Sequence, residues 1–364
     1  MNYLNQFNPD YAIHPGVYIE EILEARKMKK SDFAERCGIS SKTISQIINK
    51  KVLFSADAAV RFEKVLGVNA DLLMNMSTSY QMFEIREGKK NELKKKAEWL
   101  KKFPYKELIK FNIIQSSNDI SDLANSLLDF FNVSSPSIWD EYYSNKAISF
   151  RKSKNYKSSL HSTMTWLRIG EKLSEEIECK NFNIGVFKEN LKEIKKLTKL
   201  SLNKFEPEIK KLCNDSGVAL VLIPEFKGMR ISGITEWLTP KKALILMSLR
   251  YKTNDHFWFT FFHEAGHIIL HNKKDIFIDG IDNKDISDIE KEADVFARKT
   301  LINQANYDKF VESKKFYKNN IVKFANQNNI APGIIVGMLQ HDKLINYSWH
   351  NNLKEKFPLQ LKLK

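Results

Sequence analysis

Residues 257–271 read FWFTFFHEAGHIILH, and this stretch decides the fold of the C-terminal region. Its apolar residues predict a buried helix, on which His263 and His267 stand one turn apart, so both imidazoles can reach one metal ion. Glu264 projects about 100° round the helix from His263, where it can take a proton from the attacking water. The pattern therefore predicts a metal centre with His263 and His267 as ligands and Glu264 as general base.

A third ligand is expected from a second helix, residues 288–297, DIEKEADVFA. Glu290 and Asp294 lie four residues apart, so one carboxylate can bind the metal while the other accepts the N–H of a liganding histidine. The spacing favours Glu290 over Glu292, which points elsewhere, with Asp294 as the outer partner. His271 is the rival third ligand, but it lies two helical turns, about 12 Å, from His263 and is expected to close the helix end instead.

Two histidines, one carboxylate and an open fourth position are typical of a catalytic Zn²⁺ site, since structural zinc sites usually have four protein ligands. Upstream, residues 218–223, 231–237 and 243–249 have the pattern of strands and predict a small antiparallel sheet. Helices are expected at 256–271, 287–301, 319–328 and 332–339, which makes this region α+β. We expect strand 243–249 to pair with an extended substrate; oxyanion assistance from His256 or Tyr251 stays open.

The runs FTFFHEAGHIILH and EKEADVFARKTLI resemble the ImmA/IrrE family of zinc metallopeptidases, over about residues 200–345. The resemblance implies a zincin-like α+β peptidase domain. It also implies His263, His267 and Glu290 as Zn²⁺ ligands and Glu264 as the base. The substrate it implies is a protein, for which a repressor is a candidate.

The N-terminal region reads as short helices at 17–26, 31–37, 41–48, 56–66 and 70–74. In the second and third of these, Ala34 allows two helices to cross closely and Gly38 can take the positive φ of a turn. The second helix of the pair would then face the major groove of double-stranded DNA. The residues expected to contact DNA are Lys30, Ser41, Lys42, Thr43, Ser45, Gln46, Asn49 and Lys50.

The span from His14-Pro15-Gly16 to Asn75 resembles the Cro/repressor-like helix-turn-helix domains of HigA-type antitoxins. The resemblance implies DNA binding, and a toxin or a second copy of the chain as a further partner. Two positions depart from the family pattern. Lys30 stands where a phosphate-contacting Gln is common, and Lys50 replaces the usual Gly after Asn49.

The chain has 364 residues, with 58 Lys and Arg against 44 Asp and Glu, which gives a net charge of +14. This excess is compatible with an anionic partner. Its longest apolar runs fall far short of the roughly 18 residues of a membrane span, so no membrane partner is expected. Cys37, Cys179 and Cys213 form no CxxC pair, which fits a reducing compartment and predicts a cytoplasmic protein.

The sequence thus predicts a multidomain chain: an all-α helix-turn-helix domain at 1–76, a helical middle region at 77–205, a zinc peptidase domain at 206–345 and a tail at 346–364. The leading hypothesis is a DNA-binding transcription regulator fused to a zinc-dependent endopeptidase that acts in a stress or phage response. The alternative is a HigA-like antitoxin or repressor whose zinc site is structural or sensory. Only a general base beside the metal, Glu264, separates the two.

Overall fold

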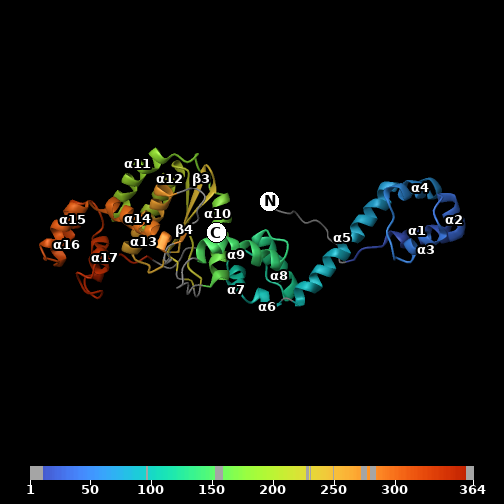
Figure 1. Cartoon of the computed structure of the whole chain (residues 1–364), viewed down its shortest axis with the longest axis horizontal. Coiled ribbons are helices and arrows are strands. Elements are labelled where there is room, and N and C mark those ends of the chain that lie inside the picture. The colour runs from blue at the N-terminus through green and yellow to red at the C-terminus, as the bar shows by residue number, and fades with distance from the viewer. Residues whose placement is uncertain are drawn as a thin grey trace. The chain divides into compact units, whose positions relative to one another are not determined.

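The computed structural model describes residues 11–357, apart from residues 96, 152–158, 227–228, 230, 249, 272–276 and 279–283. The chain divides into two compact units (Figure 1). Unit 1 comprises the described residues up to Ala97 together with Asn118–Asn125, and unit 2 comprises Glu98–Ser117 and the described residues from Ser126 onward.

Unit 1 is built from helices around one hydrophobic core, as the sequence predicts. Its helices are α1 (Pro15–Ala25), α2 (Lys30–Cys37), α3 (Ser41–Ile48), α4 (Ala56–Leu66) and α5 (Ala70–Lys95). Phe33 of α2 and Phe62 of α4 are fully buried in this core, with ring centroids 5.1 Å apart. The fifth helix differs from the short turn expected at 70–74, because it continues through a polar stretch for 26 residues.

The middle of the chain is helical wherever it is described, which confirms the predicted helical region. It contains α6 (Ala97–Leu100), α7 (Tyr105–Lys110), α8 (Ile120–Phe131), α9 (Pro136–Arg151), α10 (Leu160–Glu175), α11 (Ile184–Lys196) and the 3₁₀ helix η1 (Leu197–Lys199). In unit 2, a cluster of buried rings holds α6 against α9: Trp99 lies 4.7 Å from Phe103, which lies 4.7 Å from Trp139.

The sheet of unit 2 is mixed, which corrects the antiparallel sheet expected from the sequence. Its strands β1 (Val218–Leu222), β2 (Gly233–Thr239), β3 (Lys242–Met247) and β4 (Phe277–Ile278) lie in the order β1-β3-β2-β4. β2 is antiparallel to β3 and β4, but β1 pairs parallel with β3. Strand 243–249 was expected to bind substrate; β3 instead has a neighbour on each side, so its backbone groups are already paired.

Helices cover the two faces of this sheet. Alternate residues Leu220 and Ile245 point into the main core, which they share with Phe205 of α12 (Leu202–Asp215) and Phe261 of α13 (Asn254–Leu270). On the opposite face Leu246 packs on α10 at Gly170, where a Cβ would lie 2.5 Å from a Leu246 methyl. The HExxH helix α13 is therefore an interior helix that lies directly on the sheet.

The remaining helices of unit 2 follow α13 in sequence: α14 (Lys284–Leu301), α15 (Gln304–Glu312), α16 (Lys318–Gln327), α17 (Pro332–His341) and the 3₁₀ helix η2 (Asn351–Leu353). The first of these packs along α13, and α17 contacts both α13 and α16. The predictions located three of these helices and missed α15. Among the described residues, none of the helices has both the length and the apolar character that crossing a membrane requires.

Candidate metal centre and helix-turn-helix

The helix α13 buries every side chain of its functional motif. His263, Glu264 and His267 are at most 3% exposed. Phe257, Phe261 and Ala265 of the same helix belong to the main core. Burial of these apolar residues fixes the rotation of α13 about its axis and hence the directions of its polar side chains.

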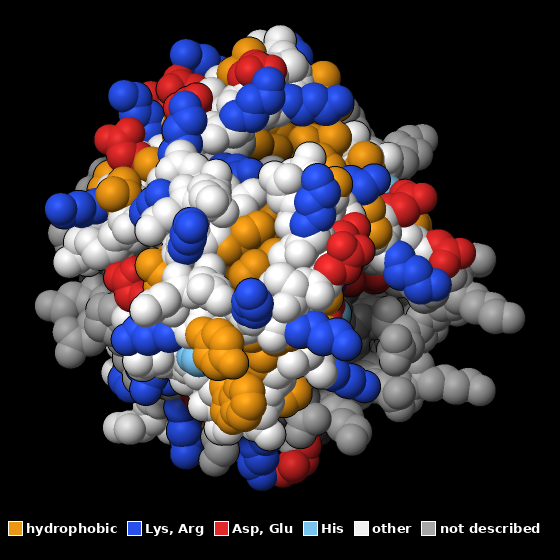
Figure 2. Space-filling view, turned by 90° about the vertical axis from the view of Figure 1, so that its left-hand side faces the viewer, with side chains coloured by type: hydrophobic (Ala, Val, Ile, Leu, Met, Phe, Trp, Pro, Cys, Tyr) orange, Lys and Arg blue, Asp and Glu red, His pale blue; other side chains and the backbone are white. Residues whose placement is uncertain are grey.

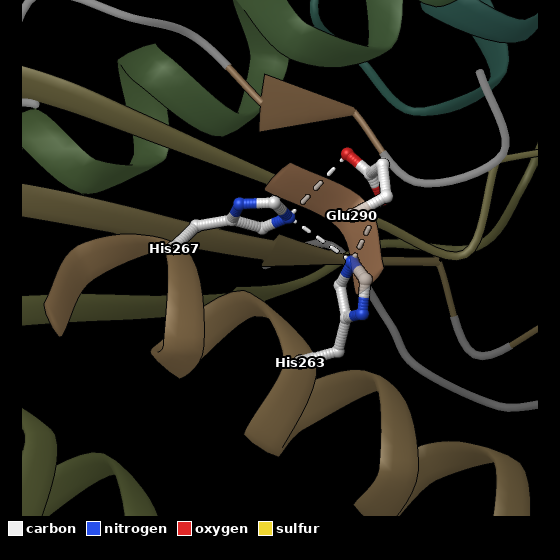
Figure 3. A group of neighbouring side chains, drawn as sticks. All are labelled: His263, His267 and Glu290. Carbon is white, nitrogen blue, oxygen red and sulfur yellow. Dashed lines mark hydrogen bonds and ion pairs between the residues drawn. The ribbon is translucent and has the colours of Figure 1, made fainter. Parts of the chain in front are cut away.

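Three side chains from two helices converge at one point (Figure 3). His263 Nε2 lies 3.0 Å from His267 Nε2 and 3.1 Å from Glu290 Oε2. His267 Nε2 lies 3.6 Å from Glu290 Oε1. Burial, with the nearby His263 and His271, lowers the pKa of His267 to about 2, so this imidazole is neutral, as a metal ligand must be.

The two candidate glutamates have different partners in the structure. Glu290 of α14 faces the two histidines of α13, whereas Glu292 lies 3.2 Å from His271 Nε2. The two residues lie about 200° apart round α14, so they cannot serve the same point. The structure therefore brings Glu290, and not Glu292, to the histidine pair.

Each liganding histidine is held from behind by a second group. His263 Nδ1 lies 2.8 Å from Asp294 Oδ1, the outer contact expected from the sequence. His267 Nδ1 lies 3.0 Å from His271 Nδ1. His271 does stand at the end of the helix, as its C-cap. Its contact with His267 was missed, although a histidine four residues after a ligand is a signal for such an outer partner.

Glu264 is held by β2, a contact that the sequence analysis did not find. Thr235 Oγ1 donates to Glu264 Oε2 at 2.6 Å and lies 3.1 Å from the Glu264 backbone carbonyl oxygen. Gly233, two residues earlier on the same strand, leaves room for this carboxylate, because a Cβ at position 233 would collide with Glu264 Oε1. No local spacing links residues 233 and 235 to 264, so only the tertiary packing reveals the contact.

The two residues considered for oxyanion assistance lie at the other end of α13. Tyr251 stacks on His256, with ring centroids 4.2 Å apart. His256 precedes His263 by seven residues, about 10 Å along the helix axis. The structure therefore does not bring Tyr251 and His256 into the group formed by His263, His267 and Glu290.

In unit 1, α2 and α3 form the predicted helix pair. Gly38 closes α2 with a φ of 63°, the left-handed conformation expected for the turn. Ser40 caps α3, because its side chain accepts a hydrogen bond from the Thr43 backbone N–H. The His-Pro-Gly start has a packing reason as well: His14 caps α1 through its Nδ1, and a Cβ at Gly16 would collide with the carbonyl oxygen of Ile47 in α3.

The predicted DNA contacts of α3 share one face. Ile44, Ile47 and Ile48 are buried, which leaves the polar residues outside. Thr43 and Gln46 are half-buried, and the fully exposed members are Ser41, Lys42, Ser45, Asn49 and Lys50. On this face Asn49 donates to Ser45 Oγ at 3.1 Å.

The two residues that depart from the family pattern have clear structural surroundings. Lys30 lies 2.6 Å from Glu20, with both side chains exposed, so this ion pair can open toward a phosphate. Lys50 has a φ of 59°, the left-handed region in which glycine is favoured, and this explains why a Gly commonly stands here.

Two family models match the chain. The model described as Helix-turn-helix matches residues 19–73, which include α2 and α3. The model described as IrrE N-terminal-like domain, of the Peptidase M78 family, matches residues 213–327, which include His263, Glu264, His267 and Glu290.

Solved structures are similar to the N-terminal part. One is a predicted antidote protein of a plasmid maintenance system from Nostoc punctiforme PCC 73102, at 32% identity over 22% of this chain and 89% of its own, with a TM-score of 0.22. A HigA-family addiction module antidote protein from Coxiella burnetii matches at 25% identity over 23% of this chain and 91% of its own, with a TM-score of 0.21. No curated protein matches the chain significantly.

Proposed function

We propose that this chain, which joins a helix-turn-helix domain to an IrrE N-terminal-like domain, is a transcription regulator that also hydrolyses a peptide bond in a protein substrate. The observation that carries the enzymatic part is the position of Glu264. It is fully buried next to the ligand His263 in sequence, and Thr235 holds its carboxylate. A site that only senses metal has no need of such an oriented base.

The spacing of the three ligand atoms fits zinc. Tetrahedral zinc, with bonds of about 2.0–2.1 Å, has ligand atoms about 3.4 Å apart. The separations among His263, His267 and Glu290 are 3.0, 3.1 and 3.6 Å, on both sides of that value. When bound, the ion would polarise the scissile carbonyl and make an adjacent water a stronger acid.

The chain's own residues then have separate tasks. Glu264 accepts the proton of the attacking water on its carboxylate and delivers it to the leaving amine. Asp294 holds Nδ1 of His263, and His271 holds Nδ1 of His267, so each imidazole turns Nε2 toward the metal. Thr235 fixes the direction of the base through its hydroxyl.

For the DNA part, α3 is the reading helix of the proposed function. Lys42, Ser45, Gln46 and Asn49 would meet base edges and phosphates of double-stranded DNA, while Lys30 and Lys50 would meet the backbone. We place the functional boundaries at 1–76, 77–205 and 206–345, with residues 346–364 following. A repressor is the proposed class of protein substrate, and a toxin or a second copy of the chain is the proposed further partner, in a stress or phage response of the cytoplasm.

The second candidate is an antitoxin or repressor with a zinc site that is structural or sensory. The ligand group argues against a structural role. It has three members among the described residues, and structural zinc sites are usually closed by four.

The test compares the full chain with Glu264→Gln, which keeps the three ligands. Each protein is purified, its zinc is quantified by elemental analysis, and it is incubated with a lysate of a strain that lacks the gene. New protein N-termini are then identified by mass spectrometry. We expect equal zinc in both proteins and cleavage by the wild type alone.

The matched control is Glu312→Gln, the same substitution at an exposed position of α15, and it should cleave like the wild type. Zinc-dependent DNA binding with an identical set of N-termini from wild type and Glu264→Gln would favour the sensory alternative.

A further inference from the structure

A second cavity lies in unit 2, apart from the metal ligands. Its volume is about 320 Å³, within the range of small-molecule sites. Its walls come from the first turns of α13, from α14, from α17 and from the segment that follows α17. The residues that the rest of the argument uses are Asp255, Phe259, Ile334, Met338 and Lys354. His263, Glu264, His267 and Glu290 do not line it.

The segment after α17 closes the cavity through a dense set of hydrogen bonds. Gln340, which is 3% exposed, donates through Nε2 to the carbonyl oxygens of Tyr347 and Trp349 and to Asn351 Oδ1. Its Oε1 accepts from Lys354 Nζ at 2.7 Å. A buried amide with all these partners holds the wall in one conformation, so the cavity exists before any ligand arrives.

Backbone contacts fasten the same segment to the start of α13. The Asn254 N–H donates to the Glu355 carbonyl oxygen at 2.9 Å, and the Glu355 N–H donates to Asn254 Oδ1 at 3.2 Å. Gly337 of α17 permits the close approach of the two helices, because a Cβ there would lie 2.7 Å from Asp255 Oδ2. Both sides of the cavity are therefore rigid.

One polar group inside the cavity stands out. Asp255 is 5% exposed, and its Oδ2 lies 2.6 Å from Lys354 Nζ. Its other oxygen, Oδ1, is buried and has no hydrogen-bond partner within the part of the chain that the structure describes. A buried carboxylate oxygen without a donor is costly, so this atom favours a ligand that supplies one.

The rest of the wall selects the body of that ligand. Phe259, Ile334 and Met338 contribute apolar surface. The Asp255 charge is already balanced by Lys354, and the Arg298 charge by its two contacts with Asp342, at 2.8 and 2.6 Å. Around α17, Figure 2 shows hydrophobic side chains gathered in the middle of this end of unit 2, with lysine and arginine side chains around them.

From these contacts we infer that the cavity is a binding site for a small neutral molecule with an apolar body and one hydroxyl group. The hydroxyl donates to Asp255 Oδ1, and the body packs on Phe259, Ile334 and Met338. Phe259 also lies against the metal centre, since its ring centroid is 6.4 Å from that of His263. A ligand here would therefore lie one ring away from a metal ligand without touching the ligand group itself.

Two isomers of equal size test this assignment on the full chain. Benzyl alcohol has the hydroxyl donor, and anisole has the same atoms without a donor. Binding is measured by ligand-observed NMR, and the site is located by the methyl resonance of Met338, assigned with Met338→Leu. We expect saturable binding of benzyl alcohol that shifts this methyl, and binding of anisole that is at least about tenfold weaker, as the loss of one hydrogen bond to a charged group implies.

Two variants locate the site independently. Met338→Trp fills the cavity and should abolish binding of benzyl alcohol, whereas Met338→Leu conserves the volume and should retain it. Thermal unfolding shows whether each variant is folded, and the comparison of isomers on the wild type needs no variant.

Equal binding of the two isomers would overturn the role of Asp255, and undiminished binding by a folded Met338→Trp would overturn the location. No saturable binding of benzyl alcohol would overturn the site for free small molecules and leave a side chain of a protein substrate as its occupant. None of these measurements depends on whether the chain cleaves protein.

Discussion

Thr235 on β2 and Glu264 on α13 are joined by a hydrogen bond of 2.6 Å between Oγ1 and Oε2. Both residues are completely buried. The strand therefore directs the carboxylate that the proposed reaction uses as its base. In water-excluded surroundings, a charge-assisted bond of this length is strong and gives the side chain one orientation.

Replacing Thr235 with Val should lower kcat for cleavage by about 10- to 100-fold, the worth of a hydrogen bond to a charged group. The shape of the side chain is conserved, so zinc content and KM should stay close to the wild type. The measurement is steady-state cleavage of the substrate identified with the Glu264→Gln control. Thr235→Ser keeps the hydroxyl and should restore most of the rate; an equal loss in both variants would show that the methyl packing, and not the hydrogen bond, matters.

His271 should tune zinc affinity through His267. Loss of the Nδ1 contact in His271→Ala should raise the zinc Kd by about 10- to 100-fold, as is usual when an outer partner of a ligand is removed. Competition with a zinc chelator measures the Kd. His341→Ala removes an exposed histidine of α17 and is the matched control. If His271→Ala and His341→Ala bind zinc alike, the His267–His271 contact has no role in holding the metal.

Asp342 should make the stability of unit 2 depend on acid. Burial raises the pKa of this carboxyl, but hydrogen bonds from Arg298, Tyr307 and His341 outweigh burial and lower it from 3.8 to about 2. A depressed folded-state pKa adds stability that is fully present above the unfolded value near 4 and is lost as pH falls toward 2. That contribution is about 2 kcal/mol at neutral pH.

Chemical denaturation of the full chain between pH 2 and pH 7 measures this effect. Asp342→Asn should lower the free energy of unfolding at pH 7 by about 2 kcal/mol and flatten its fall below pH 4. The control is Asp288→Asn, whose side chain is 76% exposed. An unchanged acid limb in Asp342→Asn would refute the assigned pKa.

The reading helix is tested by removing two exposed groups of α3. Lys42→Ala combined with Gln46→Ala should weaken binding to the DNA upstream of the gene by at least about tenfold, since one phosphate contact and one base contact are lost. Anisotropy titrations at several salt concentrations measure the Kd, and the salt dependence should fall by about one unit of slope. A double variant of similar chemistry on unit 2, Lys204→Ala with Gln304→Ala, should bind like the wild type. Unchanged binding by the α3 variant would mean that another surface reads the DNA.

The sequence by itself determined the local elements and the chemistry that they carry. Apolar periodicity and the HExxH spacing were enough to predict α13, because residues four apart on a helix must lie on one face. The turn at Gly38 followed in the same way, since few other residues adopt a positive φ. The mixed sheet was not predictable from pattern, because a strand's alternation is the same whether its neighbour runs parallel or antiparallel.

Only the tertiary structure decided which distant groups meet. Glu290 and Glu292 have the same chemistry and lie two residues apart, and the packing of α14 on α13 brings one to His263 and the other to His271. Thr235 reached Glu264 across 29 residues of sequence, and Asp255 reached Lys354 across 99, through the burial of α13 between the sheet and α17. Long-range contacts of this kind depend on how whole elements pack, and no short stretch of sequence contains that information.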